Sequence, residues 1–184
     1  HGGDQTDHEQ EPYDATRTHG GYWKAFDKSY WSHLAAGPLA RGYAVAIPSY
    51  DLCPDVRISE ISTQIAAALT EVANRTQGTI VLSGHSAGGH LVARMTDPLL
   101  LGAEVRDRIT RIVPISPVAD LAPLLQTQMN ETLRLDEAEA EAESPMNMTP
   151  PHGVDVTVWV GAQERPAFLE QAENFARSWG AKQV

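Results

Sequence analysis

Apolar residues along the chain occur in two patterns, short continuous runs and longer stretches with helical spacing. The short runs predict buried strands at 43–47, 79–83, 109–115 and 154–160. The helical spacing predicts helices at 29–41, 58–76, 87–95 and 168–179. Ser59 is a candidate N-cap for the helix at 58–76. Because strands alternate with helices, we predict an α/β protein whose mostly parallel sheet carries helices on both faces.

Two segments depart from this alternation. Residues 1–18 are acidic and show no apolar periodicity, so we predict an irregular N-terminal segment followed by a folded core at 19–184. Residues 120–143 begin with scattered leucines and end in an acidic, alanine-rich run with helical propensity. A cap inserted over an active site and an ordinary solvated surface helix both fit this second segment.

Composition narrows the classes of partner. The chain has 184 residues and a formal net charge of −10, which argues against nucleic acid or anionic membranes as partners. No run approaches the ~18 apolar residues of a membrane span, and the N-terminus has no hydrophobic signal core. The single cysteine, Cys53, excludes an internal disulfide and favours a reducing compartment. We therefore expect a cytoplasmic protein that acts on a small molecule, with homodimer formation left open.

Cofactor patterns do not occur in the sequence. No His, Cys and carboxylate set has the spacing of metal ligands, and no glycine pattern for phosphate binding is present. Cys53 follows a predicted strand and precedes a proline, which favours a loop thiol over a nucleophile. We expect neither a metal nor a cofactor.

The sequence Gly84-His85-Ser86-Ala87-Gly88 joins a predicted strand to a predicted helix. This is the G-x-S-x-G pattern in the context of a nucleophile elbow, a tight turn that exposes a serine hydroxyl. Ser86 is thus the candidate nucleophile, and the backbone N–H of Ala87 is a candidate oxyanion donor.

A second glycine-containing loop, His19-Gly20-Gly21-Tyr22-Trp23, precedes the elbow. Loops of the H-G-G-x kind supply a second oxyanion N–H, here from Gly21 or Tyr22. Its histidine is expected to organise the turn and not to act as the base. Three aromatic residues are expected to form a wall near the acyl pocket, with plain core packing as the alternative: Tyr22, Trp23 and Tyr50.

A serine nucleophile needs a base and an acid that orients the base. Glu164 follows the predicted strand at 154–160, at the sheet edge where open α/β sheets place their sites. Asp120 also follows a strand and competes for the role, whereas Asp155 lies inside a strand and is disfavoured.

With these motifs the chain resembles the α/β-hydrolases, and more narrowly the kynurenine formamidase (arylformamidase) group and small bacterial esterases. The resemblance covers about residues 19–180 and also includes Ser144-Pro145 and the segment 160–171. It implies that Glu164 is the triad acid. It also implies cleavage of a small amide or ester through an acyl-enzyme, with an aryl formamide of the N-formylkynurenine type favoured, as in tryptophan catabolism. A carboxylesterase with the same catalytic groups is the close alternative.

Two features depart from the family pattern. No histidine follows His152, although the triad histidine should follow Glu164, and Tyr13–Thr18 lacks the apolar strand expected before the H-G-G-Y-W loop. His85, His90 and His152 are not expected to serve as the base. We therefore expect an α/β-hydrolase fold that is incomplete at both ends, and a poor catalyst if the chain is complete as written. A non-catalytic binding protein on a hydrolase scaffold is the alternative of another class.

Overall fold

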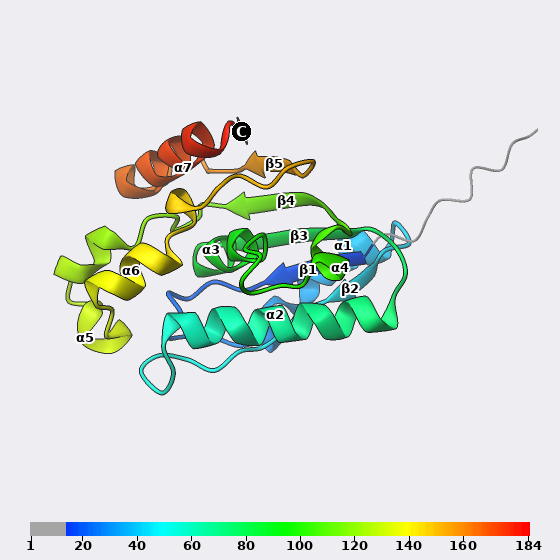
Figure 1. Cartoon of the computed structure of the whole chain (residues 1–184), viewed down its shortest axis with the longest axis horizontal. Helices are drawn as coiled ribbons and strands as arrows, with labels where there is room; N and C mark the ends of the chain where they lie inside the picture. The colour runs from blue at the N-terminus through cyan, green and yellow to red at the C-terminus, as the bar shows by residue number, and fades with distance from the viewer. Residues whose placement is uncertain (1–13) are drawn as a thin grey trace, which may run out of the picture.

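Six parallel strands form one sheet in the order β2-β1-β3-β4-β5-β6 (Figure 1). The structure is a computed structural model, and it describes residues 14–184. The strands are β1 Asp14–Thr18, β2 Ala44–Ala46, β3 Ile80–His85, β4 Ile109–Ile115, β5 Asp155–Val158 and β6 Lys182–Gln183. The main α-helices are α2 Ile58–Arg75, α3 Ala87–Arg94 and α7 Pro166–Trp179. The other helical segments are η1 Lys28–Ala35, α1 Ala36–Leu39, α4 Ala103–Arg106, η2 Ala122–Gln126, α5 Asn130–Leu133, α6 Glu137–Glu143 and η3 Pro145–Asn147.

Strand β1 corrects the prediction of an irregular segment up to residue 18. It pairs in parallel with both β2 and β3, so a strand does lead into the loop that begins at His19. Thr16 and Thr18 are each only 3% exposed. Their β-branched side chains suit a strand, and the polar composition of the segment concealed it. Residues 1–13, the rest of that prediction, lie outside the described residues.

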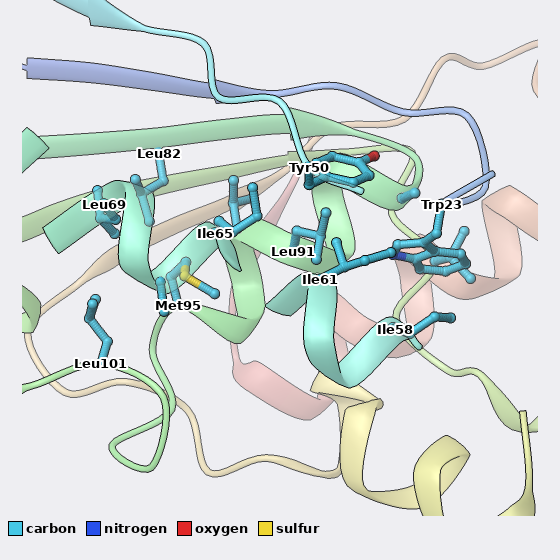
Figure 2. Close-up of a cluster of buried hydrophobic side chains, with 14 of the residues drawn as sticks. Trp23, Tyr50, Ile58, Ile61, Ile65, Leu69, Leu82, Leu91, Met95 and Leu101 are labelled. Carbon is cyan, nitrogen blue, oxygen red and sulfur yellow. The ribbon is translucent and has the colours of Figure 1, made fainter. Parts of the chain in front are cut away.

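The main core lies between the sheet and the helices α2 and α3 (Figure 2). Helix α2 buries one face at helical spacing, including Ile58, Ile61, Ile65 and Leu69. These side chains pack with Ile80 and Leu82, which alternate along β3, and with Ile109 and Ile112 of β4. This packing fixes β3, and therefore the turn at its end, against α3.

The predicted elements agree with the structure more closely in type than in boundary. The predicted helix at 29–41 is a 3₁₀ helix, η1, continued by the short α1. The N-cap of α2 is Arg57 and not Ser59, because the helix begins at Ile58, and Glu60 accepts the Arg57 N–H at 2.7 Å. Ser59 instead donates its hydroxyl to Glu139 at 2.8 Å. The two faces of the sheet do carry helices, with α1 beside a hollow lined by Ala15, Arg17, Val81, Ser83, Arg111 and Val113.

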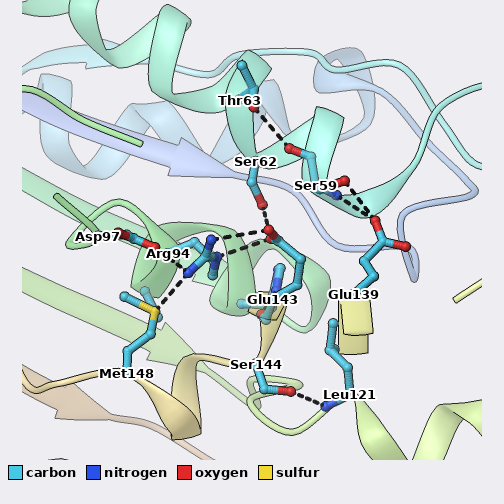
Figure 3. Close-up of polar contacts among 12 residues, drawn as sticks. Ser59, Ser62, Thr63, Arg94, Asp97, Leu121, Glu139, Glu143, Ser144 and Met148 are labelled. Carbon is cyan, nitrogen blue, oxygen red and sulfur yellow. Dashed lines mark hydrogen bonds and ion pairs between the residues drawn. The ribbon is translucent and has the colours of Figure 1, made fainter. Parts of the chain in front are cut away.

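The acidic helix α6 is fixed to the core through two of its glutamates (Figure 3). Glu139 accepts from Arg57 and from the backbone N–H of Ser59, at the start of α2. Glu143, one turn later, accepts from Ser62 of α2 and from Arg94 of α3. The helix is therefore not solvated on all sides, since it buries a charged face. Whether 120–143 acts as a cap stays a prediction.

Within residues 14–184, no helix has both the length and the apolar character that crossing a bilayer requires.

Candidate active site

Ser86 lies in a tight turn between β3 and α3, with φ +56° and ψ −117°. L-residues rarely adopt this conformation, so the surrounding structure must hold it in place. A Cβ at Gly84 would approach the carbonyl oxygen of Gly88 to 2.2 Å, so the glycine of the motif is sterically required. The N–H of Ser86 donates to the carbonyl of Ile115 at 2.8 Å, which ties the turn to β4. This geometry is that of a nucleophile elbow.

The H-G-G-Y-W loop lies directly against this elbow. A Cβ on Gly20 would come within 2.8 Å of the His85 carbonyl oxygen and 3.3 Å of Ser86 Cβ. Gly21 has φ +117°, and the next two residues, Tyr22 and Trp23, have φ +48° and +56°. The turn is closed by a hydrogen bond of 3.1 Å from Lys24 N–H to the Gly21 carbonyl.

The two candidate sources of oxyanion donors therefore lie side by side. Ala87 is the first residue of α3, and a first-turn N–H has no partner within its own helix. The roles of Gly21, Tyr22 and Ala87 as oxyanion donors stay predictions.

His19 organises the loop through its own ring and backbone. It is 3% exposed, and its ring stacks on Tyr50 with centroids 4.2 Å apart and planes 6° apart. Its Nδ1 lies 2.9 Å from the Gly20 carbonyl, and the Tyr50 hydroxyl donates to the His19 carbonyl at 3.0 Å. Burial lowers the pKa of this imidazole, although the Gly20 hydrogen bond and Asp27 oppose the effect. His19 is thus buried within the loop as expected.

The expected aromatic wall is corrected for two of its three members. Trp23 is fully buried and Tyr50 is 8% exposed, and both belong to the main core. Trp23 packs edge-on against His90, with ring centroids 5.0 Å apart. Core packing, the alternative interpretation, describes these two residues. Tyr22 is half-buried and contacts Phe168 of α7 at a centroid distance of 6.3 Å. It stays a candidate substrate contact.

Glu164 lies in the loop between β5 and α7, at the same sheet edge as Ser86. Its Oε1 accepts a hydrogen bond of 2.9 Å from the hydroxyl of Ser116, the residue that follows β4. Ser116 in turn follows Ile115, whose carbonyl accepts the Ser86 N–H. A two-residue segment therefore links the candidate nucleophile to the candidate acid. Burial raises the pKa of the Tyr22 phenol, Arg165 lowers it and Glu164 raises it.

Asp120, the competing acid, is engaged locally. Its Oδ1 accepts from the N–H of Ala122 at 3.0 Å, as in a turn that closes on its own side chain. Gln171 of α7 holds the backbone of this residue, accepting from Asp120 N–H at 2.8 Å and donating to its carbonyl at 2.9 Å. The assignment of Glu164 as the acid, with Asp120 as its competitor, stays a prediction.

None of the five histidines among residues 14–184 forms a ring hydrogen bond with Ser86. His90 is fully buried in α3 and its Nε2 lies 2.7 Å from the Glu143 carbonyl. Burial lowers the pKa of His90 to about 3, against the effect of that hydrogen bond. His152 lines a hollow with Arg106 and Thr110 near the start of β4, at the opposite edge of the sheet. His33 and His85 are exposed, and His19 is buried in its loop. None is placed as the base.

A cysteine nucleophile and a metal site, the two competing chemistries, have weak support in the described part of the chain. Burial raises the pKa of the Cys53 thiol to about 11, which disfavours the thiolate that a nucleophile requires. Residues 14–184 contain no cluster of three or more His, Cys, Asp or Glu side chains suited to a metal ion.

Sequence reasoning did not find Ser116 or the paired roles of Glu139 and Glu143. A Ser-Pro pair directly after a buried strand was the available signal for Ser116, since strand ends converge at this edge. Nothing comparable pointed to the glutamates, whose partners Arg57 and Arg94 are 82 and 49 residues away.

Comparison with known proteins agrees with this geometry. Residues 16–183 match the model of a family described by the alpha/beta hydrolase fold, and the chain belongs to that family. The kynurenine formamidase of Drosophila melanogaster is 34% identical over 175 residues, which cover 86% of this chain and 57% of the relative. The chain thus spans little more than half the length of the curated relatives that it matches.

Solved structures extend the comparison. A crystal structure from Silicibacter sp. TM1040, described provisionally as a thioesterase, superposes with a TM-score of 0.92 at 56% identity. That match covers 96% of this chain and 68% of the other. The esterase of Pyrobaculum calidifontis, in its monoclinic form, superposes with a TM-score of 0.76 at 18% identity, over 95% of this chain and 66% of the other. At that identity the likeness concerns the fold alone.

Proposed function

We propose that this chain forms the core of a serine hydrolase that cleaves a small amide or ester through an acyl-enzyme, with an arylformamidase-like activity. The observation that carries the proposal is the strained turn at Ser86, packed against the H-G-G-Y-W loop and linked to Glu164 through Ile115 and Ser116. Turns of this kind expose a serine hydroxyl beside backbone N–H groups.

In the proposed reaction, Ser86 Oγ attacks the substrate carbonyl carbon while the base removes the hydroxyl proton. The N–H groups of Ala87 and of Gly21 or Tyr22 stabilise the negative oxygen of the tetrahedral intermediate. The carbon–nitrogen or carbon–oxygen bond then breaks, and the base returns the proton to the leaving group. Water repeats the sequence on the acyl-enzyme and releases the acid. Throughout, Glu164 accepts the second ring N–H of the base.

The base of this mechanism is a histidine additional to those described in residues 14–184. The proposal follows from the placement of the described rings. His90 is buried on Glu143, His19 is enclosed in its loop, and His152 lies at the far edge of the sheet. The exposed rings of His33 and His85 form no hydrogen bond with Ser86 or Glu164.

Three related classes of acyl substrate are candidates for this site. Kynurenine formamidase relatives favour an aryl formamide, whose cleavage gives formate and an arylamine. The 56% identical structure provisionally described as a thioesterase favours a thioester as the second candidate. A carboxylesterase uses the same groups. The test is kcat/KM on an aryl formamide, an aryl acetate and an acyl thioester. A kcat/KM that is largest for the formamide supports the proposal. A kcat/KM for the formamide that is no larger than those for the acetate and the thioester overturns the formamidase assignment.

A binding protein on the same scaffold is the alternative of another class. It predicts ligand binding without turnover of any of these three substrates, even in the longest form of the protein.

A further inference from the structure

Ser116 has an unusual backbone and a buried hydroxyl. It is 2% exposed and has φ +43°, in the left-handed region that residues other than glycine rarely occupy. The conformation is held by a hydrogen bond of 2.6 Å from its N–H to the Trp159 carbonyl. Side chains kept in such a conformation cluster at functional sites.

The bent backbone directs the hydroxyl toward the candidate acid. Ser116 Oγ donates to Glu164 Oε1 at 2.9 Å, across 48 residues of sequence. The preceding carbonyl, of Ile115, accepts the N–H of Ser86 at 2.8 Å. Ile115 and Ser116 thus contact both catalytic candidates, the nucleophile through the backbone and the acid through a side chain.

We propose that Ser116 is a positioning residue that fixes the orientation of the Glu164 carboxylate relative to Ser86. This inference rests on the proposed function. By engaging Oε1, Ser116 limits rotation of the carboxylate and leaves Oε2 to accept the ring N–H of the base. Fixed orientation of a catalytic group shortens the search for the reactive geometry, and misplacement by about 1 Å can cost on the order of 100-fold in rate.

The test is a double-mutant cycle between Ser116 and Glu164 in an active form of the protein. Ser116→Ala removes only the hydroxyl, and Ser116→Gly also suits the positive φ, so at least one variant is expected to fold. Each should lower kcat by about tenfold with little change in KM, because Ser86 and the oxyanion donors are untouched. In the Glu164→Gln background the same changes should have no further effect.

Ser144 provides the matched control. It is 1% exposed, and its hydroxyl bonds only backbone groups, the Leu121 N–H and the Ala140 carbonyl. Ser144→Ala should lower the temperature of unfolding without changing kcat of the folded protein.

Three results would overturn the inference or its premise. An unchanged kcat in both Ser116 variants contradicts the positioning role. An equal loss with and without Glu164 shows that Ser116 acts independently of the acid. Full activity in Glu164→Gln alone removes the premise of the inference, because the acid role then moves to Asp120, while the proposed nucleophile Ser86 is left untouched.

Discussion

Glu143 and Glu164 are the same residue type in two contrasting surroundings. Glu143 is 4% exposed, and its carboxylate accepts from Ser62 at 2.6 Å and from two nitrogens of Arg94 at 3.1 Å each. Glu164 is half-buried and accepts from a single hydroxyl, that of Ser116. The Glu143 carboxylate joins α6 to α2 and α3. The Glu164 carboxylate, by contrast, can still accept a hydrogen bond from another group through Oε2.

The difference shows why burial alone does not identify a catalytic carboxylate. A buried ion pair such as Glu143–Arg94 offsets a large desolvation cost with its hydrogen bonds, so loss of one partner destabilises the fold. A catalytic acid must instead be oriented and still reachable by its base. The comparison predicts that Glu164 variants lose activity and that Glu143 variants lose stability.

The largest loss of activity is expected from substitution of Ser86, the candidate nucleophile. Ser86→Ala should lower kcat/KM by about 10⁵-fold or more, because no other group replaces the nucleophile. Since the side chain is small and Ala tolerates the same backbone, chemical denaturation should give a nearly unchanged free energy of unfolding. Retained turnover in this variant would refute the assignment of the nucleophile.

The next largest loss of activity is expected at Glu164 and not at Glu143. Glu164→Gln should lower kcat by about 10²- to 10⁴-fold, because an amide cannot stabilise the charged base that forms in the transition state. Its free energy of unfolding should change by less than about 1 kcal/mol. Glu170→Gln, at an exposed position of α7, is the control. An unchanged kcat in Glu164→Gln would move the acid role to Asp120.

The converse holds for Glu143. Glu143→Gln should lower the free energy of unfolding by about 3 kcal/mol, because the buried Arg94 loses one of its charged partners and keeps only Asp97. Glu141→Gln, on the exposed face of the same helix, should change it by less than about 0.5 kcal/mol. Urea denaturation of the two variants measures both values. Equal effects would mean that the ion pair does not fix α6.

The last effect appears only as a dependence on pH, near the same Glu143. The folded pKa of His90 is lowered to about 3, well below the ordinary value of 6.5. Between these two values the unfolded chain binds a proton that the folded chain does not, so stability falls as the pH falls. The contribution is full above pH 6.5 and is lost toward pH 3, with a slope of about 1.4 kcal/mol per pH unit.

Denaturation at several pH values tests this point. His90→Gln should flatten the pH dependence of unfolding across that window, while His33→Gln, at an exposed position, should leave it unchanged. A slope that persists in His90→Gln would assign the effect to other groups.

The sequence predicted the strand-and-helix order and the elbow because both depend on local patterns. Alternation of apolar runs identified β3, β4 and β5, and the glycines around Ser86 identified the turn between β3 and α3. Glu164 was placed at the correct sheet edge because parallel strands end together.

Three features were not fixed by the sequence, for physical reasons. Strand β1 was missed because its buried positions are threonines, whose strand preference is weaker evidence than an apolar run. The core positions of Trp23 and Tyr50 were one of two interpretations, because only tertiary packing distinguishes a buried ring from a pocket wall. The inward face of α6 was missed because its charge suggested solvent, whereas the neutralising arginines come from α2 and α3.

The most direct test of the central claim is covalent labelling of the protein with a fluorophosphonate probe, followed by mass spectrometry of the labelled peptide. The probe reacts with an activated serine at an oxyanion site. The account predicts one adduct on Ser86 in the active form of the protein and none in Ser86→Ala. An adduct on another residue, or no adduct in a form of the protein that turns over substrate, would contradict it.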